Sequence, residues 1–247
     1  GGCITDCRAT DTGGGGVDLR GSTAILYISG TARIENCTAG EVWGANAIFN
    51  SGTMYADGGT VDGTVNNQGT IKHSNGVTDV TVFNEAVYNR AKKIIEAGIY
   101  KGTVENRGSI TGGTFYGGVT DDGGTIRGGT FAVTFDIGDG TKTEPTLVEY
   151  NNPVPERAAP TKSGHTFTGW YLGEEKYNFD TPVTAPLTLT AKWEKVPSSG
   201  GYYYYPTTDT KADDAKGSPK TADPGIALYA ALSLLSLTGL TCTAKKR

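Results

Sequence analysis

The chain has 247 residues with a formal net charge of −4, 36% apolar residues, 37 glycines and one methionine. This length allows one or two domains, and the low apolar content argues against an architecture of long amphipathic helices. The mild acidity and the lack of a basic stripe argue against nucleic acid as a partner, since phosphate contacts need clustered Lys and Arg.

The sequence begins with glycine and shows no charged-then-apolar leader. Either a secretion signal has been removed or the sequence is a fragment. We favour a fragment, because residues 1–7 read as the middle of a repeat.

Cysteine usage predicts neither a disulfide framework nor a metal site. The cysteines are Cys3, Cys7, Cys37 and Cys242. The first two have no second close-spaced pair and no histidine nearby, so we expect small buried side chains, no metal and no cofactor.

The N-terminal repeat pairs residues 4–9 with residues 34–39, which share the pattern I-x-[DN]-C-x-A. The stretch between them contains short β-prone runs broken by Gly and Ser. Since equivalent residues of a repetitive fold stack, we expect Cys7 and Cys37 to lie one above the other in the core.

A second, tighter repeat follows, with about fifteen or sixteen residues between adjacent copies. Each copy reads x-x-G-x-[VYF]-x-G-x-V, then three or four variable residues, then G-[TS]-I. Its large apolar positions are Val61, Val65 and Ile71; Tyr100, Val104 and Ile110; and Phe115, Val119 and Ile126. Phe131 begins a further copy.

This short period predicts a parallel β-helix or β-solenoid over residues 1–131, truncated at its N-terminus. Each coil supplies short strands with one inward apolar side chain apiece, and Gly or Asn at the corners permits the positive φ of tight bends. Stacking then buries a continuous column that no single coil could bury alone.

Residues 84–98 fit this pattern less well. Apolar residues between Val87 and Ile95 recur at helical spacing, although residues 95–100 align with residues 110–115 of the next copy. We favour an irregular solenoid coil over a local helix.

Residues 132–195 have less glycine, and aromatic and β-branched residues alternate with polar ones. Pro153, Pro155 and Pro160 mark an extended connector, and the runs FTGWY and LTLTAKW are typical of strands. Two tryptophans in so small a segment supply much of a compact core.

This segment resembles the Listeria–Bacteroides repeat, also called the internalin B-repeat, in the order and spacing of its motifs. They are Val133–Asp136 (VTFD), Pro160–Thr161, Gly164–Tyr171 (GHTFTGWY), Phe179–Asp180 and Leu187–Trp193 (LTLTAKW). His165 stands where the family usually has an aromatic residue. The resemblance implies a β-grasp-like module of bacterial surface proteins without catalytic residues.

Residues 196–217 are small, polar and charged without periodicity, which predicts a flexible linker. The linker contains four consecutive tyrosines, Tyr202 to Tyr205. We prefer to read them as a spacer with sticky side chains rather than as a stacking site for a partner or sugars.

Residues 225–244 carry no charge over twenty positions. A helix of that length spans roughly 30 Å, the hydrocarbon thickness of a bilayer. Lys245, Lys246 and Arg247 would then stop in the cytoplasm. We prefer this transmembrane helix to a buried helix of a globular domain, because the segment is apolar all round and follows a linker.

The motif S-P-K-T-A-D lies just upstream, as Ser218, Pro219, Lys220, Thr221, Ala222 and Asp223. With the apolar span and the basic tail, residues 218–247 resemble the cell-wall sorting signal of Gram-positive surface proteins, commonly L-P-x-T-G. The resemblance implies that sortase cleaves between Thr221 and Ala222 and joins Thr221 to the peptidoglycan cross-bridge. Pro219 would fix an extended backbone for recognition, while Ser218 and Ala222 depart from the common form and leave the sortase class open.

β-Solenoids also host polysaccharide lyases and hydrolases, whose sites need clustered carboxylates with Arg or Lys, or a bound calcium. The candidates are Asp57, Asp62, Asp79, Asp121 and Asp122. We expect them to be turn residues, because turns favour Asp and none obviously stacks with Arg or Lys of a neighbouring coil. His73 and His165 belong to no catalytic constellation, and we expect surface positions for both.

The sequence therefore predicts a mainly β, wall-anchored extracellular protein with no catalytic residues. Its repetitive surface would bind a host protein or a glycan. Two alternatives stay open: a glycan-active enzyme, and a passive stalk for an upstream domain. An enzyme predicts product release from a polysaccharide, an adhesin predicts saturable binding without turnover, and a stalk predicts neither.

Overall fold

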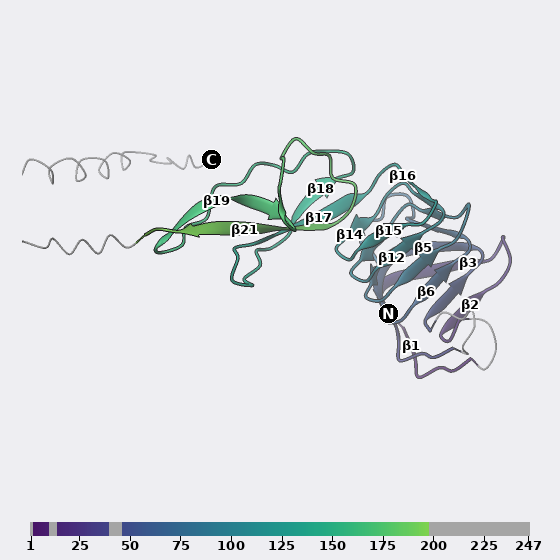
Figure 1. The fold of residues 1–247 in the computed structure, drawn as a ribbon. Coiled ribbons are helices and arrows are strands. Elements are labelled where there is room, and N and C mark those ends of the chain that lie inside the picture. The colour runs from purple at the N-terminus through teal and green to yellow at the C-terminus, as the bar shows by residue number, and fades with distance from the viewer. Residues whose placement is uncertain (1, 10–13, 40–45, 198–247) are drawn as a thin grey trace, which may run out of the picture. The chain divides into compact units, whose positions relative to one another are not determined.

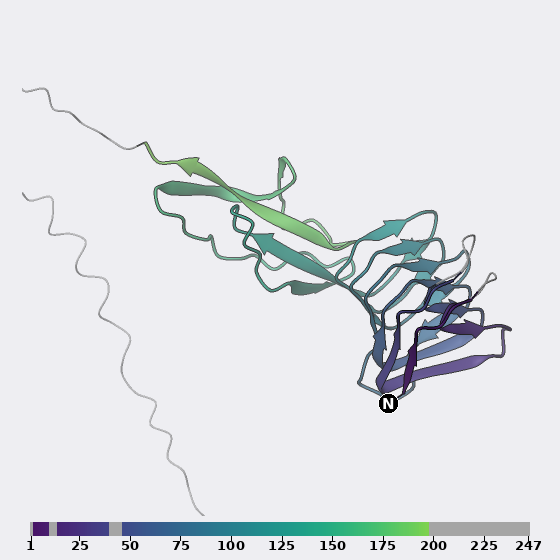
Figure 2. The same cartoon turned by 90° about the horizontal axis from the view of Figure 1, so that it is seen from below.

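The computed structural model describes residues 2–9, 14–39 and 46–197, and every regular element in them is a β-strand (Figure 1). The first part of the chain is a β-solenoid, as predicted, whose coils stack so that equivalent strands pair in parallel (Figure 2). Each coil has three corners and contributes strands to three faces, which we call the V, I and F faces.

The V face is a six-stranded parallel sheet with one strand from each coil. Its strands are β2 (Val17–Leu19), β4 (Ile48–Asn50), β6 (Val65–Asn67), β9 (Val87–Asn89), β12 (Val104–Asn106) and β15 (Val119–Asp121).

The I and F faces belong to one larger sheet, because two long strands run through both faces near the N-terminus. These strands are β3 (Ile25–Glu35) and β5 (Thr53–Val61). The I face continues in β7 (Thr70–Lys72), β10 (Ile94–Ile95), β13 (Ser109–Ile110) and β16 (Thr125–Ile126). The F face comprises β1 (Cys3–Thr5), β8 (Val82–Phe83), β11 (Ile99–Tyr100), β14 (Thr114–Phe115) and the start of β17 (Thr130–Asp136).

The three predicted apolar columns exist, one behind each face. Tyr100 pairs with Phe115, and Phe115 pairs with Phe131. These three residues are fully buried, and their rings stack with centroids 4.9 and 5.3 Å apart. Phe83 extends the aromatic column at 5.0 Å from Tyr100. Burial weakens in the first and last coils, where Val17 and Val119 are half-buried.

The irregular segment 84–98 forms strands β9 and β10, so the solenoid interpretation is confirmed and the helical alternative is wrong. Val87 pairs with Val65 and with Val104, and Ile95 pairs with Ile71 and with Ile110. The helical spacing arose by coincidence, because the corner between the two strands has an unusual length and places Lys92 at φ +63°.

The two I-x-[DN]-C-x-A segments stack in register. Ile4 pairs with Ile34, and the backbone N–H of Thr38 donates to the carbonyl of Cys7 at 2.9 Å. The Asp or Asn position of the pattern adopts φ +55° in both copies, a conformation that these residues tolerate. Cys3, Cys7 and Cys37 are free thiols. The expectation of buried side chains is confirmed for Cys37 and is wrong for Cys3, which is exposed, and for Cys7, which is half-buried. Burial raises the pKa of the Cys37 thiol.

A column of amide side chains, which we call the amide ladder, runs inside the V face. Each asparagine donates to the next at 2.8 Å, and the last donates to a carboxylate at 2.9 Å. The members in order are Asn50, Asn67, Asn89, Asn106 and Asp121. The four asparagines are essentially fully buried, and none was recognised in the sequence as part of the core.

The second part of the chain is a small sheet in the order β18–β17–β21–β19–β20. Its further strands are β18 (Thr146–Glu149), β19 (His165–Leu172), β20 (Glu175–Lys176) and β21 (Leu187–Lys195). The first and last strands, β17 and β21, pair in parallel at the centre, as in a β-grasp sheet, with an extended connector between β18 and β19. Trp170 is buried, and its ring meets the Phe135 ring edge-on with centroids 4.8 Å apart. The Trp193 Nε1 donates a hydrogen bond to the Ile137 carbonyl at 2.7 Å.

β17 belongs to both parts, because Thr130 and Phe131 pair with β14 while Val133 to Asp136 pair with β21. The expected boundary between residues 131 and 132 therefore falls inside one strand. Among the described residues there is no helix long and apolar enough to cross a membrane. The expected linker beyond residue 197, the sorting signal 218–223, the apolar segment 225–244, the basic tail and Cys242 lie outside these residues.

Candidate binding groove

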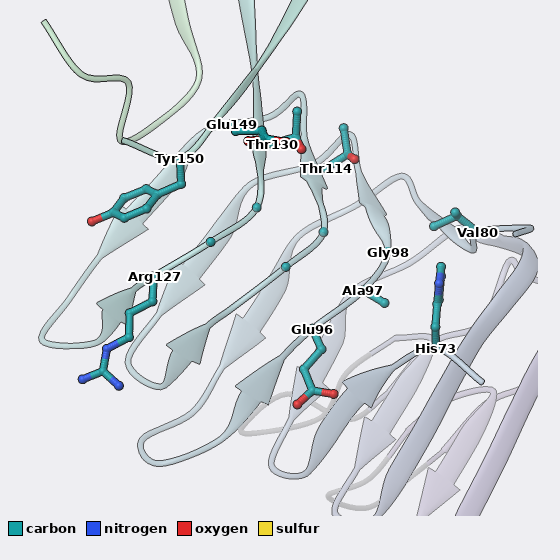
Figure 3. Close-up of a pocket in the computed structure, with 14 residues that line it drawn as sticks. His73, Val80, Glu96, Ala97, Gly98, Thr114, Arg127, Thr130, Glu149 and Tyr150 are labelled. Atoms are coloured by element: carbon teal, nitrogen blue, oxygen red, sulfur yellow. The ribbon is translucent and has the colours of Figure 1, made fainter. Parts of the chain in front are cut away.

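An open groove of about 490 Å³ lies at the corner between the I face and the F face. Its floor and sides come from three consecutive turns, at residues 96–98, 112–114 and 127–130. Residues of the loop 73–80 and the pair 149–150 lie at its two ends (Figure 3). We call this feature the groove.

The floor consists of glycine because the coils approach too closely there for any side chain. A Cβ on Gly112 would lie 2.1 Å from the Glu96 carbonyl oxygen, and a Cβ on Gly128 would lie 2.3 Å from the Thr111 carbonyl oxygen. A second row of glycines turns the chain toward the F face with φ between +97° and +120°: Gly98, Gly113 and Gly129. The same backbone demands that shape the corner therefore leave a trough along its outside.

The two ends of the groove are bordered by segments outside the tight repeat. His73 and Val80 come from the long connection between β7 and β8, and Tyr150 follows β18 (Figure 3). The Tyr150 backbone N–H donates to the Gly129 carbonyl at 2.8 Å, and its ring meets Phe131 edge-on with centroids 6.3 Å apart. Tyr150 thus caps the aromatic column and also borders the groove.

The groove carries two carboxylates and one guanidinium. Glu96 and Arg127 occupy equivalent positions, directly after the I-face isoleucine of their coils, and their side chains project on the same side (Figure 3). Glu149 lies at the end near Tyr150. In the described part of the chain, neither Glu96 nor Arg127 forms an ion pair, and the Nε2 of His73 is buried without a hydrogen-bond partner.

The row of Glu96 and Arg127 continues toward the N-terminus as a chain of stacked residues. Register places Tyr27 beside Tyr55 and Tyr55 beside Lys72. The two tyrosine rings are parallel within 7° at 4.6 Å, and the Lys72 Nζ lies 5.0 Å from the Tyr55 ring. Tyr27 is 60% exposed.

None of the five candidate aspartates lines the groove. Asp57 lies in strand β5 rather than in a turn, and it is buried. Its carboxylate accepts hydrogen bonds from the Ser74 N–H at 2.9 Å and the Ser74 hydroxyl at 2.6 Å, which offset the cost of burying it. Asp121 also lies in a strand rather than in a turn, at the end of β15, where it ends the amide ladder. Asp62 accepts from the Asn84 side chain, and Asp79 is exposed.

The expectation that these aspartates do not pair with Arg or Lys of a neighbouring coil is wrong for Asp62 and Asp122. The Arg33 guanidinium lies 4.0 Å from the Asp62 carboxylate. The Arg107 guanidinium lies 2.6 Å from the Asp122 carboxylate, and both side chains are more than half exposed. Exposed pairs of this kind contribute little stability. The structure describes no cluster of three His, Cys, Asp or Glu side chains that could hold a metal ion within its resolved ranges.

The two histidines lie in different places. His165 begins β19, with its Nδ1 2.9 Å from the Ser163 carbonyl oxygen, and His73 borders the groove. The sequence did not reveal Glu96, Arg127, Glu149 or Tyr150 as neighbours, because their proximity depends on coil register.

A Listeria–Bacteroides repeat domain is present at residues 131–192. This confirms the family resemblance of residues 132–195. Two relatives from Evansella cellulosilytica are similar to this chain. One, named "Putative Gly-rich membrane protein", is 38% identical over 66 residues, and one named "Putative membrane protein" is 37% identical over 65 residues. Each match covers 25% of this chain but only 8% and 10% of the respective relative.

Proposed function

We propose that this chain is a bacterial cell-surface protein that sortase anchors to the cell wall and that binds a ligand in the groove. Three findings support surface display. The repeat domain at residues 131–192 is of a kind typical of surface proteins, relatives carry membrane-protein names, and residues 218–247 have the composition of a sorting signal.

The observation that carries the binding role is the groove itself. Four of its polar side chains stand on three successive turns: Glu96, Thr114, Arg127 and Thr130. The backbones of these turns are hydrogen-bonded to one another, from the Thr114 N–H to the Gly98 carbonyl and from the Thr130 N–H to the Gly113 carbonyl, both at 2.8 Å. A site on such a scaffold is held in place before the ligand arrives, which lowers the entropic cost of binding.

Anchoring would use the residues after the described part of the chain. A sortase cysteine would attack the Thr221 carbonyl and release the segment that begins with Ala222. An amine of the peptidoglycan cross-bridge would then displace the cysteine, so that Thr221 ends in an amide bond to the wall.

A second candidate function is glycan hydrolysis, and a specific observation favours testing it. Glu96 and Glu149 both line the groove, and glycosidases use two carboxylates that flank the scissile bond. Reducing-sugar release by the wild type, lost in Glu96→Gln and Glu149→Gln, would replace the adhesin proposal with an enzyme. A passive stalk would show neither binding nor release.

Mass spectrometry of the C-terminus tests the anchoring proposal. The full chain is expressed in a Gram-positive host with its sortases, beside Thr221→Ala as the matched control. We expect a species that ends at Thr221 and carries a cross-bridge peptide for the wild type alone. An intact C-terminus at Arg247 in both proteins would refute wall anchoring.

A further inference from the structure

We infer that the groove binds a linear, uncharged chain of pyranose sugars that lies along the solenoid axis with one sugar unit over each turn. This inference deepens the proposed ligand-binding role and rests on it. It concerns the groove alone and does not depend on how the protein is anchored.

The spacing of the turns favours a sugar chain over a peptide. Adjacent parallel strands lie about 4.8 Å apart, so the turns at 96–98, 112–114 and 127–130 repeat at that interval along the groove. An extended peptide advances only about 3.3 Å per residue and falls out of step after one turn. A pyranose unit in an extended chain has nearly the length of one turn, so each unit meets an equivalent patch of floor.

The floor suits a flat ring. Because Gly112 and Gly128 can carry no side chain, the backbone forms a smooth surface that a ligand can approach closely. Thr114 and Thr130 stand at equivalent positions along the F-face side of the groove. Their hydroxyl groups can donate and accept hydrogen bonds, as sugar hydroxyl groups require.

The charges favour a neutral chain over a polyanion. Glu96 and Glu149 outnumber the one guanidinium, Arg127, in the groove, so a ligand with a carboxylate or sulfate on each unit would be repelled. Neutral sugars, in contrast, can donate hydrogen bonds from their hydroxyl groups to the carboxylates and accept hydrogen bonds from Arg127. Neither Glu96 nor Arg127 forms a side-chain hydrogen bond with another described residue, so both retain their bonding capacity for a ligand.

Each end of the groove offers a feature that fits a terminal sugar. Tyr150 is half-buried and presents an aromatic ring, on which the C–H face of a pyranose can pack. At the opposite end the groove is bordered by the imidazole ring of His73 (Figure 3).

Calorimetry with neutral β-1,4-linked oligosaccharides of two to six units tests the inference on the purified full chain. We expect affinity to rise with length and to level off once about three or four units cover the three turns and the ends. Tyr150→Ala and Arg127→Ala should each weaken binding roughly tenfold or more, as loss of a central contact does. The matched control is Tyr116→Ala, an exposed tyrosine that does not line the groove.

Each result decides a separate point. Circular dichroism checks that every variant is folded. If Tyr150→Ala and Arg127→Ala bind oligosaccharides with wild-type affinity, the groove is not the binding site. Binding of only sulfated or uronic oligosaccharides, or of extended peptides tested in parallel, would overturn the ligand class. Failure of all oligosaccharides to bind would overturn this inference, whereas wall anchoring would stand or fall by the cross-bridge peptide at Thr221.

Discussion

Replacing Asn106 with alanine should remove one rung of the amide ladder and destabilise the solenoid strongly. The Asn106 side chain donates to Asp121 at 2.9 Å and to the Thr125 carbonyl at 3.4 Å. It accepts from Asn89 at 2.8 Å and from the Gly108 N–H at 3.2 Å. At about 1 kcal/mol for each hydrogen bond, and with the exposed Asp121 regaining water, the loss in unfolding free energy is roughly 3 kcal/mol.

The matched control is Glu105→Ala, one residue earlier on the same strand. Glu105 is exposed and forms no side-chain hydrogen bond with the described residues, so its replacement should change the unfolding free energy by no more than about 0.5 kcal/mol. Urea unfolding of the full chain, followed by far-UV circular dichroism, gives both values. If the two variants differ by less than about 1 kcal/mol, the ladder is not a stabilising element.

The isosteric change Asn106→Asp gives the same idea a pH dependence. A buried carboxyl beside Asp121 would have its folded pKa raised by desolvation and by the like charge. The variant is therefore most stable while this carboxyl is protonated. The variant should therefore approach wild-type stability below the unfolded pKa of about 4 and lose stability as the pH rises toward 7. A pH-independent deficit would contradict this reasoning.

Three further predictions concern the core and corners. Gly112→Ala should lower the unfolding free energy by about 2 kcal/mol or more, because its Cβ would lie 2.1 Å from the Glu96 carbonyl oxygen. Gly118→Ala is the control in the same urea assay. Its Cβ would lie 3.9 Å from the nearest atom, on Thr103, so its effect should be almost neutral. Phe115→Ala opens a cavity between two stacked rings and should cost about 3–5 kcal/mol, seen as a lower thermal midpoint. Burial raises the pKa of Tyr100, so the unfolding free energy of the wild type should fall above a pH of about 10, where the unfolded tyrosine ionises. The unfolding free energy of Tyr100→Phe should fall less between about pH 9 and about pH 11, as measured by urea unfolding at both values.

The apolar columns were predictable because their residue types repeat with the coil. Val65, Val104 and Val119 recur at one position of the motif, and pairing confirms it. The amide ladder repeats equally well, yet Asn67 and Asn106 fall in a segment of three or four residues that differs between copies. Because polar residues in such a segment ordinarily face water, nothing in a single copy indicates that these side chains point inward.

The groove could not be predicted for a different reason. The position after the I-face isoleucine is Glu96 in one coil and Arg127 in another, so residue type does not repeat and gives no signal. Glu149 and Tyr150 come from beyond the solenoid motif altogether. Only the stacking of coils, together with the return of the chain through β18, brings these side chains to one trough.

The sharing of β17 between two sheets also has a mechanical consequence. A pulling force between the solenoid and the residues after β21 enters β17 at its N-terminal end and leaves β21 at its C-terminal end. The two strands pair in parallel from Val133 opposite Leu187 to Asp136 opposite Thr190. This force therefore loads all their hydrogen bonds in shear at once, rather than breaking them one at a time. The central strand pair of the small domain is therefore placed where the molecule resists traction along its chain, and its rupture rate rather than its equilibrium stability sets how long it holds.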